Sequence, residues 1–174
     1  LRIRKALRML VNGDLHDISI DTYKEAYANN FKTLNLQWIE EYFVVEEEDL
    51  KILSNPQSYV IDKGGEIFFA LLEDKIIGTS AMVCISPKVF ELAKMSVEKS
   101  FQGQGIGRML IGASIDFAKH KGAKEIFLVT NDKLLPALNL YKSSGFNLDL
   151  DYHDMRYERG NTKMKLDLDK GEKL

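Results

Sequence analysis

The sequence has little of what marks disulfide-stabilised, metal-binding or membrane-spanning proteins. Cys84 is the only cysteine and stands in an apolar run. No disulfide can therefore form within the chain, which agrees with a reducing, cytoplasmic location. The three histidines, His16, His120 and His153, lack the spacing of metal ligands, so we expect no metal site. No apolar stretch is long enough to cross a bilayer and no signal peptide is visible, so we expect no membrane partner.

The net charge is also small. It is −2 over 174 residues, which gives no electrostatic reason to expect a nucleic-acid partner. With 45% hydrophobic and 29% charged residues, the composition is that of a globular protein able to bury a full core. No internal repeat or low-complexity linker divides the chain. We therefore expect one domain over residues 1–174, with residues 169–174 as a frayed tail.

The first third of the chain is predicted to be mainly helical. Residues 2–7 are predicted to form a short strand. Residues 14–30 have the pattern of a helix with Asp14 as its N-cap. A second helical region covers residues 36–53 and is interrupted near the acidic run of residues 46–49. We interpret that run as a solvated helix face or a helix N-terminus.

The rest of the chain combines strands and helices. Short polar turns separate the first β-rich segments, which predicts an antiparallel meander of residues 58–61, 67–72, 76–85 and 89–97. The pattern then predicts a helix over residues 106–121, a buried strand over 125–130 and a second helix over 134–144. A final strand pair is predicted over residues 146–152 and 162–168. A helical crossover between two strands implies a parallel pair in an otherwise antiparallel sheet. The predicted fold class is α/β in the α+β sense, a mixed, mostly antiparallel sheet flanked by helices.

Three glycines at alternate positions follow the strand of residues 89–97. The segment reads Gln102-Gly103-Gln104-Gly105-Ile106-Gly107-Arg108. Such glycines let the backbone approach a ligand closely, and the helix start behind them adds unpaired N–H donors and the positive end of the helix dipole. This predicts a seat for a phosphate or pyrophosphate, although a glycine-rich turn without a ligand is the alternative. A dinucleotide fingerprint would need a glycine where Arg108 stands, and no Gly-Lys-Ser/Thr of a P-loop follows.

The second segment of interest is the helix of residues 134–144, with Asn131 before it. Leu134, Leu138 and Tyr141 share one face of this helix. Taken alone, Tyr141 is therefore a core aromatic with a satisfied hydroxyl. Gly145 is explained as a helix C-cap, and Asn131 as a cap or turn residue.

Together, the two segments resemble the two motifs of the GNAT superfamily of N-acetyltransferases. The first motif is Gln-x-x-Gly-x-Gly at a helix start, and the second is a helix that ends with a tyrosine before Gly-Phe, here Tyr141 before Gly145 and Phe146. The resemblance covers residues 14–168 by the order of elements and residues 90–107 and 131–146 by motif. It implies the GNAT (acyl-CoA N-acyltransferase) fold.

The resemblance implies direct transfer of an acetyl group from acetyl-CoA to a primary amine in a ternary complex. In this family the pantetheine arm lies between two strands that splay apart, here residues 89–97 and 125–130, and the pyrophosphate lies at the helix start. The cofactor-binding residues so implied are Met95, Ser96, Val97, Gln102, Gly103, Gln104, Gly105, Ile106, Gly107, Arg108, Asn131 and Asn139.

The resemblance also implies two catalytic residues. Tyr141 would lie near the thioester sulfur, where a phenol can protonate the departing thiolate, and a backbone N–H near Met95 would stabilise the oxyanion. An alkylamine has a reference pKa of about 10 and must lose a proton before it attacks. Glu91 stands in an otherwise apolar strand and is the candidate base. The alternative is that Glu91 is solvated on the open face of the sheet and paired with Lys94.

Other features admit two interpretations. Asp149, Asp151 and Asp154 could form an acidic wall for a cationic substrate, but we favour a plain half-exposed strand. The aromatic residues of segment 38–43 lie where GNAT substrate-gating helices lie, and a packing stripe explains them equally well. We expect a small-molecule amine as acceptor, because nothing suggests a docking surface. One alternative is that the acceptor is an amine of a peptide or protein, and another is that the chain is a non-catalytic acyl-CoA-binding module. A homodimer is compatible with the sequence.

Overall fold

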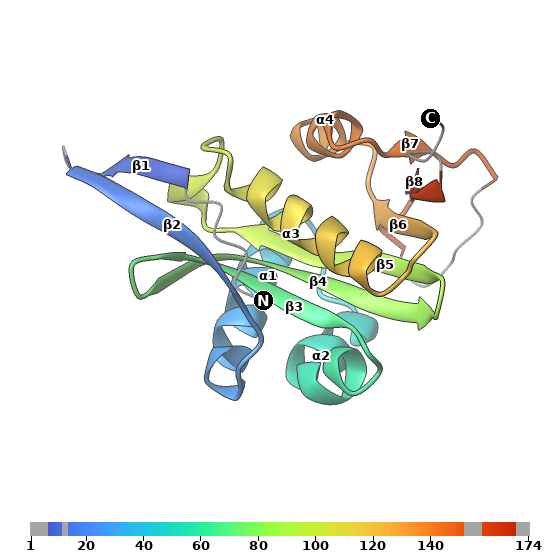
Figure 1. Cartoon of the computed structure of the whole chain (residues 1–174), viewed down its shortest axis with the longest axis horizontal. Helices are drawn as coiled ribbons and strands as arrows, with labels where there is room; N and C mark the ends of the chain where they lie inside the picture. Colours follow the sequence, from blue (N-terminus) through green and yellow to red (C-terminus); the bar gives the residue numbers. More distant parts are fainter. Residues whose placement is uncertain (1–6, 12–13, 152–157, 170–174) are drawn as a thin grey trace.

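The computed structural model describes residues 7–11, 14–151 and 158–169. Its strands form one sheet in the order β1-β2-β3-β4-β5-β6-β8-β7 (Figure 1). Neighbouring strands are antiparallel except β5 and β6, which are parallel. The strands are β1 (Leu7–Val11), β2 (Asp14–Thr22), β3 (Glu66–Leu72), β4 (Lys75–Ser86), β5 (Val89–Val97), β6 (Glu125–Thr130), β7 (Asn147–Leu148) and β8 (Thr162–Asp167).

Helices cover both faces of this sheet. Helix α3 lies across one face, and α1 and α2 lie on the other (Figure 1). The helices are α1 (Ala28–Tyr42), α2 (Glu47–Ser54), α3 (Ile106–His120) and α4 (Leu135–Ser143), with the short turns η1 (Glu25–Tyr27), η2 (Gln57–Ile61) and η3 (Lys99–Phe101). No helix in the described part of the chain is long and apolar enough to cross a membrane.

The sheet separates two hydrophobic cores. On the α3 side, Phe68, Phe90 and Leu110 belong to one buried cluster. On the α1 and α2 side, Phe31 and Phe69 belong to the other. Successive side chains of a strand point to opposite faces, so β3, with its continuous run of apolar residues, supplies both cores.

The structure corrects two predictions for the first third of the chain. Residues 14–30 do not form one helix, because residues 14–22 are strand β2, which pairs with both β1 and β3. Ile18, Thr22 and Ala26 recur at helical spacing, which led to the prediction, but the strands that pair with residues 14–22, not the local sequence, decide their structure. Residues 58–61 are not a strand but part of the π-helical turn η2, which directs Val60 into the core.

Other boundaries change less. The helical region of residues 36–53 is divided into α1 and α2, and the acidic run forms the N-terminus of α2, where Glu46 and Asp49 make a capping box. Strand β6 is buried only at alternate residues, so it is not the fully buried strand predicted. The final strand pair is present, although β7 is only two residues long. Residues 2–6 and 170–174, with their predicted strand and tail, lie outside the described residues.

The remaining predictions of fold are confirmed. The meander of β3, β4 and β5, the helix α3, the parallel partner β6 and the helix α4 are present at the predicted places. A pair of buried hydroxyl groups joins α3 to the sheet. The oxygen atoms of Ser80 on β4 and Ser114 on α3 are 2.9 Å apart, and the Ser114 hydroxyl donates to the carbonyl of Leu110 at 2.8 Å. Because the Ser114 hydrogen is used in that bond, Ser80 is the donor between the two.

This donor order predicts an asymmetry in stability. Ser114→Ala strands the buried Ser80 donor and should lower the free energy of unfolding by about 1 to 3 kcal/mol. Ser80→Ala leaves the bond from Ser114 to Leu110 intact and should cost less. The double variant should be more stable than Ser114→Ala alone, because no stranded donor remains. Urea unfolding of the three variants measures this, and equal losses for the two single variants would contradict the assigned donor.

Candidate active site

Strands β5 and β6 separate at their carboxyl ends. Their pairing runs from Val89 opposite Glu125 to Glu91 opposite Phe127 and stops there, although both strands continue. Each keeps its outer neighbour, β4 for β5 and β8 for β6. The β6-facing edge of residues 92–97 therefore has no strand partner among the described residues. Its backbone is available to a ligand that lies between the two strands, as the sequence predicted.

A β-bulge in β5 lies beside this gap. Ala81 pairs with Ala93, and Thr79 pairs with Ser96, so β5 has one residue more than β4 over this interval. Lys94 takes up the extra length with a φ of 50°, in the left-handed region. The bulge turns the backbone around Lys94 and Met95 out of the regular ladder. It does so at the point where the two strands separate.

The glycine loop after β5 presents a row of unpaired backbone donors. Gly103 and Gly105 have φ values of 75° and 87°, and Gly105 is the N-cap of α3. The backbone N–H groups of residues 103–108 donate no hydrogen bond to any described residue. The side chain of Gln102 donates to the carbonyl of Val97 at 2.9 Å and so holds the loop against the end of β5. Six successive donors at a helix N-terminus are suited to a phosphate or pyrophosphate.

A cavity of about 650 Å³ extends from this loop along the gap. Arg108 lies at the loop end, where its guanidinium donates to the Ser143 hydroxyl at 3.0 Å. The walls come from α1, the end of β5, the glycine loop and α4: Trp38, Tyr42, Phe43, Met95, Ser96, Val97, Phe101, Gln102, Gly103, Gly105, Ile106, Gly107, Arg108, Lys133, Leu134, Pro136, Ala137, Leu140 and Tyr141. We call it the cofactor cavity.

A second cavity, of about 320 Å³, lies on the α1 and α2 side of β5. We call it the acceptor cavity. Glu91 forms part of its wall and is only 6% exposed, so it is not the solvated surface residue of the alternative interpretation. Apolar side chains such as Ile52 and Val83 also line this cavity, together with Asn35 from α1. The wall of the acceptor cavity is therefore mixed: apolar side chains stand beside the carboxylates of Glu48 and Glu91 and the cationic side chains of Lys63, Lys94 and Arg159.

The two cavities share one wall. Six residues line both of them: Trp38, Phe43, Met95, Leu134, Ala137 and Tyr141. Burial raises the pKa of Tyr141 to about 12, so its phenol is protonated at neutral pH. Its hydroxyl makes no hydrogen bond with a described residue, and its ring packs edge-on to Phe146. A protonated phenol with an uncommitted hydroxyl thus stands where a group from one cavity would meet a group from the other.

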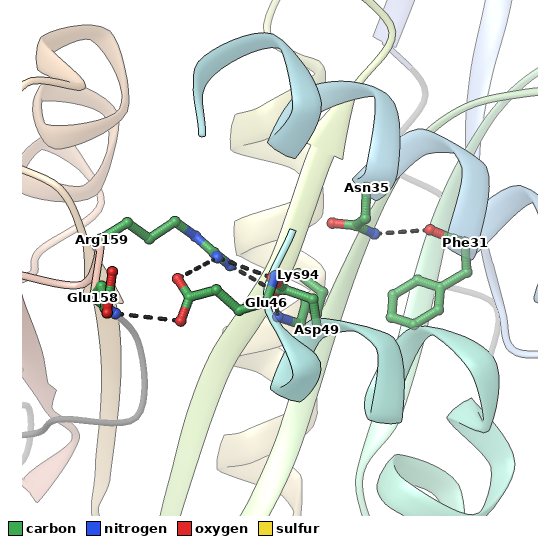
Figure 2. Close-up of polar contacts among 7 residues, drawn as sticks. All are labelled: Phe31, Asn35, Glu46, Asp49, Lys94, Glu158 and Arg159. Carbon is green, nitrogen blue, oxygen red and sulfur yellow. Dashed lines mark hydrogen bonds and ion pairs between the residues drawn. The ribbon is translucent and has the colours of Figure 1, made fainter. Parts of the chain in front are cut away.

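Lys94 and Arg159, which line the acceptor cavity, belong to a cluster of charges that we call the Asp49 cluster (Figure 2). The Asp49 carboxylate, fully buried on α2, lies 2.6 Å from the Lys94 ammonium and receives two hydrogen bonds from Arg159, at 2.5 and 2.9 Å. Arg159 also binds Glu46, whose other oxygen accepts the backbone N–H of Glu158. Burial alone would raise the pKa of Asp49, but hydrogen bonds from Arg159 and the charge of Lys94 outweigh it and hold the pKa below its usual value.

All but three of the predicted cofactor-binding residues line the cofactor cavity. Asn131 lines the acceptor cavity instead, and its side chain donates to the carbonyl of Arg159 at 2.8 Å. Gln104 is exposed and donates to the carbonyl of Ser100. Asn139 is exposed on α4 and lines neither cavity. No group of three or more His, Cys, Asp or Glu in the described chain could hold a metal ion.

Several residues of the acceptor cavity and of the Asp49 cluster were missed in the sequence. In the sequence alone, Asn35 is a single polar position on an amphipathic helix, and Asp49 is one of four consecutive acidic residues that are expected to be solvated. Lys94 carried a signal, because a lysine in an apolar strand needs a partner. That partner lies 45 positions away in the sequence, and Arg159 is 110 positions from Asp49, so local patterns could not pair them.

Comparisons with known proteins agree with this geometry. A family model described as Acetyltransferase (GNAT) family matches residues 19–146. The uncharacterized N-acetyltransferase YvbK of Bacillus subtilis is 29% identical over 109 residues, which cover 61% of this chain and 70% of that protein. N-acetyltransferase 8B of Homo sapiens is 32% identical over 95 residues, which cover 52% of this chain and 42% of that protein. The chain thus spans less than half of the human relative.

Solved structures share the fold. A GNAT family acetyltransferase from Staphylococcus aureus has a TM-score of 0.78 at 23% identity and covers 87% of this chain and 99% of its own. A putative acetyltransferase from Salmonella typhimurium, solved with its cofactor acetyl-CoA, has a TM-score of 0.71 at 16% identity and covers 90% and 96%. Since the family match spans well over half of the chain, the chain belongs to the acetyltransferase (GNAT) family and is an acetyl-CoA-dependent N-acetyltransferase.

Proposed function

We propose that this enzyme acetylates a primary amine of a small molecule, which attacks acetyl-CoA directly in a ternary complex. One observation carries the proposal: the cofactor cavity and the acceptor cavity meet at Tyr141 and Met95. A thioester placed at this junction faces the acceptor cavity without any covalent relay. The volume of the acceptor cavity, about 320 Å³, suits a small ligand better than a folded protein surface.

Acetyl-CoA would occupy the cofactor cavity along its length. The backbone N–H groups of residues 103–108 and the Arg108 guanidinium would hold the pyrophosphate, and the unpaired edge of residues 92–97 would bind the pantetheine amides. The Salmonella protein of the same fold was solved with its cofactor acetyl-CoA, which supports acetyl-CoA as the ligand of this cavity. Asn139 has no place in it, because its side chain lies outside the cavity.

The reaction would proceed in three proton-balanced steps. Glu91, in the wall of the acceptor cavity, takes a proton from the amine, directly or through a water. The amine nitrogen then attacks the thioester carbon, and a backbone N–H at the bulge near Met95 stabilises the oxyanion. As the carbon–sulfur bond breaks, the Tyr141 hydroxyl gives its proton to the thiolate, and the nitrogen, which is cationic after the attack, gives its extra proton to water. The products are the acetylated amine and coenzyme A, and solvent returns a proton to Tyr141 and takes up the one held by Glu91.

The glycine loop generates a prediction on cofactor binding. Gly105→Ala puts a Cβ on the loop at a φ of 87° and should disturb the backbone donors, weakening coenzyme A binding by more than about tenfold, or about 1.4 kcal/mol. Gly64→Ala is the matched control, since Gly64 also has a φ of 87° and a Cβ there would meet nothing within 4 Å. Calorimetric titration measures both. Equal affinities in the two folded variants would remove the loop from the binding site.

The role of Glu91 predicts a specific pH dependence. Glu91→Gln should lower kcat/KM most at neutral pH and progressively less at higher pH, because rising pH deprotonates the amine without help. Glu48→Gln is the control, since Glu48 lines the same cavity but is paired with Lys51 at 2.8 Å. The measurement is kcat/KM against pH for both variants. If the Glu91→Gln profile runs parallel to that of the wild type, another group is the base.

Tyr141 generates the sharpest prediction. Tyr141→Phe should lower kcat roughly a hundredfold to ten-thousandfold wherever thiolate departure limits the rate, with little change in coenzyme A affinity or Tm. Because the pKa of Tyr141 is about 12, its acid form persists and kcat should show no decline below about pH 11 that depends on Tyr141.

Tyr59→Phe is the control for that substitution. It also removes a tyrosine hydroxyl, but from a residue that lines the acceptor cavity alone and does not lie at the junction of the two cavities. We therefore expect kcat to stay close to that of the wild type. All values should come from one preparation of each variant. A Tyr141→Phe enzyme within about threefold of the wild-type kcat would assign Tyr141 to packing.

A further inference from the structure

Asn35 stands out among the residues of the acceptor cavity because it is polar, buried and only half used. It lies on α1 and is 1% exposed. Its side-chain nitrogen donates to the carbonyl of Phe31, one helical turn earlier, at 2.9 Å (Figure 2). Its side-chain oxygen accepts no hydrogen bond from a described residue. No buried side-chain oxygen or nitrogen of the described residues lacks a hydrogen-bond partner, so the unpaired oxygen of Asn35 must be open to the acceptor cavity, where a ligand can reach it.

The orientation of this amide follows from chemistry. The Phe31 carbonyl can only accept, so the NH₂ group of Asn35 must face it and the oxygen must face the opposite way. Figure 2 shows the oxygen turned away from Phe31. Asn35 also lines the acceptor cavity. The site that the oxygen offers is therefore specific for a hydrogen-bond donor.

Asn35 is also held close to the bulge of β5. The carbonyl of the preceding residue, Leu34, accepts a hydrogen bond from the buried Ser96 hydroxyl at 3.0 Å. Ser96 is the residue directly after the bulge at Lys94 and Met95, and Met95 lies at the junction of the two cavities. This bond fixes α1 against β5, so the Asn35 oxygen is positioned near the place where the acceptor nitrogen must arrive.

We propose that the side-chain oxygen of Asn35 accepts a hydrogen bond from the amino group of the acceptor and is a specificity-determining residue for it. The inference rests on the proposed function of the acceptor cavity. A neutral primary amine has two N–H groups: it loses one as the amide forms and keeps the other, which can stay hydrogen-bonded to this oxygen. A neutral secondary amine has a single N–H and must lose it as the amide forms, so none remains for Asn35.

The test uses Asn35→Leu, which keeps the approximate volume and removes the oxygen. The wild type is first assayed for thiol release with a panel of primary alkylamines and arylalkylamines. For the best of these, Asn35→Leu should raise the KM of the amine about tenfold or more, with little change in coenzyme A affinity. Asn30→Leu is the matched control, since Asn30 is exposed on the same helix and lines neither cavity.

Two further measurements separate binding from folding. Asn35→Gln keeps both an amide donor and an amide oxygen at this position and should restore part of the affinity lost in Asn35→Leu, even if the leucine variant folds poorly. The preference of the wild type for a primary amine over its N-methyl derivative should shrink in Asn35→Leu, which a loss of packing alone would not produce.

The outcomes distinguish this inference from the proposed function. If the wild type acetylates no amine of the panel, the proposal for the acceptor cavity fails and this one fails with it. If the wild type is active and folded Asn35→Leu keeps the same amine KM and the same preference for primary amines, only the role of Asn35 is overturned. A raised KM with a reduced preference supports the hydrogen bond to the amino group.

Discussion

The acceptor side of the site depends on one buried carboxylate. Asp49 belongs to α2, yet its oxygens bind Lys94 at the bulge of β5 and Arg159 just before β8, so one side chain joins three distant parts of the chain. Glu46 and Asp49 balance the charges of Lys94 and Arg159, which makes the burial of Asp49 and the partial burial of the other three tolerable. Loss of Asp49 would deprive two cations of this partner at once. We therefore regard the Asp49 cluster as the link between α2 and the catalytic edge of the sheet.

The cofactor side depends on a sheet that is interrupted in a controlled way. A regular β5–β6 ladder would use the backbone groups that a pantetheine arm needs, whereas here pairing stops at Glu91 and Phe127. The separation is stable because each strand keeps its outer partner, and because the Ser96 hydroxyl fixes the far end of β5 to α1. The left-handed φ of Lys94 stores some strain at the bulge. The ion pair of Lys94 with Asp49 offsets it, so the two sides of the site stabilise each other.

The sequence predicted those parts of the molecule that local patterns determine. The glycine loop, the helix behind it, the β3–β5 meander and the parallel partner β6 were found because turn residues and periodicity are short-range signals, and the family match confirms the fold they implied. Residues 14–22 were predicted as helix because Ile18, Thr22 and Ala26 recur at helical spacing, and only the pairing with β1 and β3 selects the strand. Asn35, Asp49 and Arg159 could not be found this way, because their importance comes from contacts across the fold. The roles of Glu91 and Tyr141 stay predictions.

The residues at the junction of the cavities favour direct attack over an acyl-enzyme intermediate. A covalent relay needs a nucleophile close to the thioester, yet five of the six shared residues are Trp38, Phe43, Met95, Leu134 and Ala137, which have no nucleophilic oxygen or thiol. Cys84 lines neither cavity, and the Ser96 hydroxyl donates to Leu34. The sixth residue, Tyr141, has a pKa of about 12, which makes its phenol a poor nucleophile at neutral pH but leaves its proton in place. The same burial that makes Tyr141 a poor nucleophile therefore supports its proposed role as the acid that protonates the departing thiolate.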